Sequence, residues 1–131
     1  MEPHFDQLAQ DEFRFLTEQY GFSIDSVKPN AVRYLSDKVA IEINYSARNE
    51  IDVIVDTNPP SHRFQFRLFL KLFHPDVEQA LGYGIAYSDD DVSRELRRFS
   101  EALKHHGAAI LRGDRAVFER IKNTKWWELA P

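Results

Sequence analysis

The stretch KVAIEINYSARNEIDVIVD, residues 38–56, decides the fold class because apolar and polar residues alternate along it. The apolar positions are Val39, Ile41, Ile43, Tyr45, Ile51, Val53 and Val55. The polar positions between them include Glu42, Asn44, Asp52 and Asp56. Alternation with a period of two is typical of β-strands that bury one face and leave the other in water. We therefore predict two antiparallel strands here, with one apolar face and one polar face.

The turn between these two strands follows from pairing apolar residues across the hairpin. A three-residue loop, 47–49, places Ile43 opposite Val53 and buries both on the same face. The third loop position often needs a left-handed backbone, a conformation that Asn49 tolerates. A shift of one residue would move the apolar side chains into water, so the alternation specifies the pairing.

A third strand precedes this hairpin and extends the meander. A two-residue turn at Ser36 and Asp37 places Tyr34 opposite Val39, which again pairs apolar residues. The predicted buried face of the meander thus includes Tyr34, Val39, Ile43 and Val53.

Apolar residues spaced by three and four predict helices on both sides of the meander. The first helix is expected from Phe5 to Tyr20, where Gly21 ends it. A C-terminal helix is expected to start after Ser88 as N-cap and to continue to about residue 112, weakened at Gly107. Residues 62–73 fit a strand followed by a short helix. We therefore predict a single α+β domain, 1–131, with an antiparallel sheet of three to four strands packed on one face by the N-terminal and C-terminal helices.

Composition excludes several classes of function. The 131 residues contain no Cys, which excludes thiol catalysis, thiolate metal sites and disulfides, and is consistent with a reducing cytoplasm. The net charge of −4 argues against nucleic acid as a partner, which favours a strong positive field. The first residues are acidic, so we expect no signal peptide, and no apolar run approaches the roughly 20 residues of a membrane span. We expect a cytoplasmic protein that binds neither nucleic acid nor membrane.

Short motifs that resemble catalytic or metal sites have simpler explanations as parts of helices. The acidic run 89–91 falls in a first helical turn, where carboxylates stabilise the helix dipole. His105 and His106 are adjacent and diverge on a helix, whereas metal ligands prefer spacings of three or four. The RGD tripeptide at 112–114 fits a helix end followed by the next N-cap. We predict no catalytic residue, cofactor or metal.

The polar face of the sheet is the main candidate for binding. In the predicted registers Asn44 lies opposite Asp52, and Glu42 lies diagonal to Arg33. These residues could hold a general acid and base, or could pair across strands on a face that meets solvent or a protein partner. We expect the second alternative.

Trp126 and Trp127 are a further candidate. They either dock on the body of the domain or anchor a partner, since Trp is frequent among interface hot spots.

The sequence resembles small uncharacterised bacterial proteins, some of which occur among immunity-protein-like genes of toxin systems. The resemblance rests on FRFLTEQYGF (13–22), VAIEINYSARNEIDVIV (39–55) and ILRGDRAVFERI (110–121), which are packing patterns without a catalytic signature. It implies a cytoplasmic domain that works by binding another protein.

The sequence therefore leaves three interpretations open. We expect a non-catalytic protein-interaction domain, such as an immunity protein that neutralises a toxin. The alternative is a small-molecule-binding protein or minor enzyme with a pocket between sheet and helices. A homodimer formed through an open sheet edge or through the pair Trp126 and Trp127 is the third.

Overall fold

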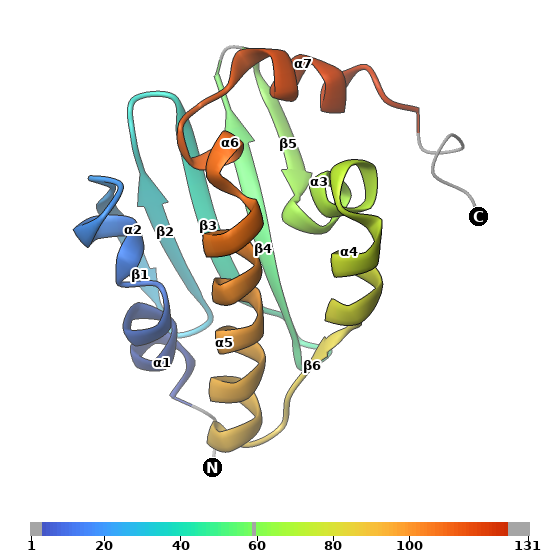
Figure 1. Ribbon diagram of the computed structural model, residues 1–131. Helices are drawn as coiled ribbons and strands as arrows, with labels where there is room; N and C mark the ends of the chain where they lie inside the picture. The colour runs from blue at the N-terminus through green and yellow to red at the C-terminus, as the bar shows by residue number, and fades with distance from the viewer. Residues whose placement is uncertain (1–3, 59, 126–131) are drawn as a thin grey trace.

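The computed structural model describes residues 4–58 and 60–125 and has two layers, an antiparallel sheet and a layer of helices (Figure 1). The strands, in their order across the sheet, are β1 (Ser23–Lys28), β2 (Ala31–Leu35), β3 (Val39–Tyr45), β4 (Glu50–Thr57) and β5 (His62–Gln65). A two-residue strand, β6 (Gly84–Ile85), also pairs with β4. The predicted α+β class with an antiparallel sheet is confirmed, but the sheet has more strands than the three to four predicted.

The helices lie over one face of this sheet. They are α1 (Phe5–Glu12), α2 (Phe15–Glu18), α3 (Phe66–Phe73), α4 (Pro75–Leu81), α5 (Asp89–His106), α6 (Ala108–Leu111) and α7 (Arg115–Lys122). The long α5 crosses the middle of the sheet, with α1 on one side of it and α3 and α4 on the other (Figure 1). None of these helices is long and apolar enough to cross a lipid bilayer.

The apolar side chains of the strands form the core beneath these helices, as predicted. Tyr34, Val39, Ile43 and Val53 are all at most 3% exposed. Burial alternates along β4 in particular, where every second residue is buried. The opposite face, which we call the outer face, carries the polar side chains and has no described helix over it (Figure 1).

The β3–β4 hairpin has the predicted register. Ile43 pairs with Val53, and Asn44 pairs with Asp52. Asn49, at the third loop position, has a φ of 60°. The amide side chain of Asn tolerates this left-handed conformation, so the loop length inferred from apolar pairing is confirmed.

The β2–β3 register differs from the prediction by two residues. Tyr34 pairs with Ile41 rather than with Val39, so the centre of the turn is Asp37 and Lys38. The side chain of Ser36 stabilises this turn, since its Oγ accepts hydrogen bonds from the N–H groups of Lys38 (3.4 Å) and Val39 (3.2 Å). A shift of two residues keeps every side chain on its own face, which is why the buried face was predicted correctly.

The predicted N-terminal helix is broken into α1 and α2 at Phe13 and Arg14. Phe13 is 0% exposed and Phe15 is 5% exposed. Residues two apart point about 200° apart on one continuous helix, so both rings reach the core only if the helix is interrupted between them. Gly21 ends α2 with a φ of 72°, as predicted.

Tyr34, which is buried, and Tyr45, which is partly buried, differ in hydrogen bonding. This difference predicts that the same Tyr→Phe substitution has a different effect on stability at each position. The Tyr45 hydroxyl lies 2.6 Å from the carbonyl oxygen of Ala86 and 3.0 Å from Oδ1 of Asn49. The Tyr34 hydroxyl has no hydrogen-bond partner among the described residues. We expect Tyr45→Phe to lower the free energy of unfolding by about 1 kcal/mol, and Tyr34→Phe to lower it by less than about 0.5 kcal/mol. Urea denaturation measures the free energy of unfolding of both variants. Equal losses for the two variants would contradict this difference in hydrogen bonding.

Candidate functional site

The four polar residues predicted from the meander lie together on the outer face. Arg33 is paired directly with Glu42, not diagonally as predicted, because of the two-residue change in the β2–β3 register. Asn44 is opposite Asp52, as predicted. Trp126 and Trp127 lie outside the described residues.

Arg33 and Glu42 belong to an ion-pair network that spans all five long strands. Asp56 of β4 is its centre, since one carboxylate oxygen accepts hydrogen bonds from Arg33 Nη1 (2.7 Å) and Arg63 Nη1 (2.6 Å). Arg63 Nη2 also lies 3.2 Å from Glu42, and Arg33 Nε lies 3.4 Å from Asp25 of β1. The hydrogen bond with Asp56 raises the pKa of Arg33. Such a network holds long side chains in fixed positions on a surface that faces solvent.

Asn44 and Asp52 form a second polar group beside this network. The side-chain amide of Asn44 donates to Glu42 (3.2 Å), and that of Gln65 donates to Asp52 Oδ2 (2.8 Å). The backbone N–H of Val53 donates to Asp52 Oδ1 (2.9 Å). These hydrogen bonds connect Asn44 to the ion-pair network through Glu42, and connect Asp52 of β4 to β5 through Gln65.

Asp52 makes stability depend on pH. Burial raises the pKa of Asp52, although the Val53 N–H and the charge of Arg67 act in the opposite direction. Because the folded pKa lies above the unfolded value of about 4, the folded state holds the proton more tightly, and stability is lost as pH rises from there through the folded pKa. We expect Asp52→Asn to remove this loss. Urea denaturation at several pH values from about 4 upward tests it, and an unchanged difference between variant and wild type across the series would contradict it.

A stripe of large side chains borders the polar part of the outer face. Tyr83, Ile85 and Tyr87 are 79%, 44% and 67% exposed, whereas Gly84 and Ala86 between them are buried. Ile85 pairs with Glu50, whose side chain lies on the same face of β4 as Asp52. Ile85 thus lies on the outer face at one end of the sheet, and the exposed Tyr83 and Tyr87 flank it; we call Tyr83, Ile85 and Tyr87 the stripe.

Sequence analysis did not predict this stripe. The segment GYGIAYS (82–88) has no local strand pattern long enough to predict it, because two glycines interrupt it and its pairing partner lies more than thirty positions away in β4. The available signal was the alternation of large residues with Gly84 and Ala86. Gly84 is required there, since a Cβ at this position would lie 2.6 Å from the carbonyl oxygen of Ile51 and 2.8 Å from the ring of Phe99.

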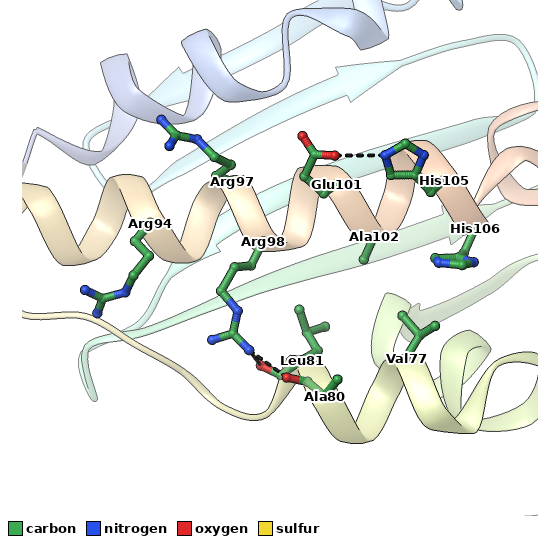
Figure 2. A pocket seen from close by; sticks show the side chains of 10 residues that line it. All are labelled: Val77, Ala80, Leu81, Arg94, Arg97, Arg98, Glu101, Ala102, His105 and His106. Carbon is green, nitrogen blue, oxygen red and sulfur yellow. Dashed lines mark hydrogen bonds and ion pairs between the residues drawn. The ribbon is translucent and has the colours of Figure 1, made fainter.

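A groove of about 460 Å³ lies in the helical layer between α4 and α5 (Figure 2). Val77, Ala80 and Leu81 form one wall, and the other wall carries charged side chains of α5. Two of these polar side chains are already paired: His105 with Glu101 at 2.9 Å, and Arg97 with Glu12 at 3.2 Å.

Arg98 crosses the end of this groove and connects its two helices. Its Nη2 donates to the carbonyl oxygens of Ala80 (2.7 Å) and Leu81 (2.8 Å) at the end of α4 (Figure 2). Its Nη1 lies 2.9 Å from Glu95, which is 4% exposed. The guanidinium of Arg98 therefore has a structural role and is already paired at this end of the groove.

The short motifs act in the helix termini, as predicted. Ser88 Oγ accepts a hydrogen bond from the N–H of Asp91 at the start of α5, and Asp114 caps α7. Gly113, between α6 and α7, has a φ of 73°. Within residues 4–58 and 60–125, no group of three His, Asp or Glu side chains is placed to hold a metal ion.

The chain matches no protein-family model, no curated protein sequence and no solved structure.

Proposed function

We propose that this protein is a non-catalytic interaction domain that binds another protein through the outer face of its sheet. The observation that carries the proposal is the exposed stripe Tyr83, Ile85 and Tyr87 beside an ordered ion-pair network on a face without helices. Following the resemblance to immunity-like bacterial proteins, we propose a toxin as the partner, bound and neutralised in the cytoplasm.

The stripe supports this proposal because its side chains are large and largely outside the core. Tyr is enriched among residues that dominate binding energy, since it supplies a large rigid contact area with only two side-chain torsions. Adjacent exposed apolar side chains on a folded domain are typical of interaction sites. Tyr45 and Gly84 hold the segment against β4, so its side chains are presented in fixed positions.

The charges of the outer face favour a basic partner. Its carboxylates are Asp25, Glu42, Glu50, Asp52 and Asp56. Its cationic side chains, Lys28, Arg33 and Arg63, are fewer. Complementary charge accelerates association and selects partners, and salt weakens this effect. We therefore expect the association rate to fall as the salt concentration rises.

The proposal is tested with the product of a neighbouring toxin-like gene as the partner. We expect a stable complex by size-exclusion chromatography with light scattering. We expect the double variant Tyr83→Ser/Tyr87→Ser to weaken binding by about 30-fold or more in calorimetry, the effect of losing a hot spot. Phe73→Ser is the matched control, because Phe73 is 40% exposed but lies on α3 in the helical layer. A double variant that binds like wild type would contradict the proposal.

The alternative hypothesis is that the protein forms a homodimer, and the same chromatography tests it. β1 is an edge strand that pairs with β2 alone, and Ile24 and Val27 on it are each 45% exposed. Such an edge can pair with a second copy. Asp25 lies at the irregularity in the β1–β2 register, and a charge at such an irregularity opposes edge pairing. We therefore expect a monomer in the absence of the partner.

A further inference from the structure

A polar pocket of about 220 Å³ is lined by side chains of the α1–α2 segment and of the strands β1 and β2. Figure 1 shows these elements side by side at one edge of the molecule. Its helical wall includes Gln7, Gln10, Asp11 and Arg14, and its sheet wall includes Ile24 and Tyr34. Tyr34 belongs to the buried face of the sheet, so this pocket opens on the opposite side from the outer face.

The Tyr34 hydroxyl is the reason to regard this pocket as a binding site. Tyr34 is 1% exposed, yet its hydroxyl has no hydrogen-bond partner among residues 4–58 and 60–125. Every fully enclosed side-chain nitrogen and oxygen in those ranges does have a partner, so this hydroxyl keeps its small exposed area at the pocket. Burial, with a smaller effect from the charge of Asp11, raises the pKa of Tyr34 to about 12. The hydroxyl is therefore protonated at neutral pH and available to donate.

The helical wall places opposite charges next to each other. Arg14 Nη2 lies 3.2 Å from Asp11 Oδ1, and both side chains are about half-exposed, at 62% and 47%. Ion pairs this exposed are weak, so a ligand can compete for either member. The side-chain amide N–H of Gln10 donates to the carbonyl oxygen of Asp6 (3.2 Å).

This combination selects a particular class of ligand. A ligand with one net charge would be attracted by Asp11 or Arg14 and repelled by the other. A ligand that carries both charges interacts favourably with each, and the volume suits only a small molecule. We propose that this pocket binds a small zwitterion of the α-amino acid class, with its ammonium at Asp11, its carboxylate at Arg14, and a hydrogen bond from Tyr34.

The proposal is tested by NMR titration of the isolated, isotope-labelled protein with L-alanine and L-serine. We expect saturable shifts of backbone amides within residues 7–17 and at Tyr34. Tyr34→Phe removes only the hydroxyl, and we expect it to weaken binding about three- to tenfold, the value of one hydrogen bond. Tyr45→Phe is the matched control, since Tyr45 does not line the pocket, and we expect its affinity to equal that of wild type.

Arg14→Gln provides a second variant that leaves the core untouched, and we expect it to weaken amino acid binding as well. Methylamine, acetate and glycerol test the ligand class, and we expect each to bind more weakly than either amino acid. The proposal is overturned if about 10 mM amino acid shifts none of these amides, if a single-charge probe or glycerol binds as tightly, or if Tyr34→Phe binds like wild type. The titration involves no partner protein, so its outcome is separate from that of the proposed function.

Discussion

Replacing Arg98 with alanine is expected to lower the free energy of unfolding by about 2–4 kcal/mol. The variant leaves the carboxylate of Glu95, which is 4% exposed, with only the longer contact to Arg94 Nε at 3.4 Å. It also removes two hydrogen bonds to the last carbonyl oxygens of α4. A buried charge that loses its partner costs far more than a surface ion pair contributes. Urea denaturation measures the loss.

Two further variants separate this explanation from a general effect of removing arginine. Arg97 is the neighbouring residue on α5, and it makes a surface ion pair with its side chain 65% exposed. We expect Arg97→Ala to cost less than about 1 kcal/mol. Glu95→Gln in the Arg98→Ala background removes the buried charge, and we expect it to restore part of the stability. Equal losses for Arg97→Ala and Arg98→Ala would contradict the assigned role.

Adding a single methyl group at Gly84 is expected to lower the free energy of unfolding by about 1–3 kcal/mol. The Cβ of Gly84→Ala would lie 2.6 Å from a backbone oxygen of Ile51, which cannot move without disturbing β4. The backbone of β6 must therefore shift, and the pairing of Ile85 with Glu50 is lost with it. We expect faster amide exchange in the β6 segment, and weaker binding of the partner because the stripe is displaced.

Tyr83→Ala is the control for this prediction. It removes a whole ring from the adjacent position, but that ring is 79% exposed. We expect its stability to remain within about 0.5 kcal/mol of wild type. If the larger truncation at Tyr83 costs more stability than the methyl group added at Gly84, the result contradicts the explanation that β6 packs closely on β4.

The alternation of apolar and polar residues predicted which side chains lie on each face of the sheet, but it did not predict every strand register. Apolar residues recur at every second position in both β2 and β3, so registers that differ by two residues bury the same side chains. The hydrogen bonds of Ser36 select between them, and these were not evident from apolar pairing alone. In the β3–β4 hairpin the loop length left one good solution, with Asn49 in the left-handed position.

The two strands that were not predicted, β1 and β6, lack a regular alternation of apolar and polar residues in the sequence. β1 is an edge strand that is mostly exposed along its length, and the irregularity at Asp25 interrupts its alternation. β6 is two residues long and exists because β4 pairs with it. The polar residues of β3 and β4 on the outer face were predicted because apolar and polar residues alternate over most of both strands. The stripe, the Tyr34 pocket and the role of Arg98 depend on contacts between distant segments, which the sequence pattern does not specify.

Cysteine labelling measures most directly whether the outer face binds a partner. The chain contains no cysteine, so Tyr87→Cys and Phe73→Cys each provide a single reactive site, in the stripe and in the helical layer respectively. Labelling rates are compared with and without a saturating amount of the neighbouring toxin-like gene product. We predict that the complex protects position 87 and leaves position 73 as reactive as before. Unchanged labelling at position 87 in the complex would contradict the account.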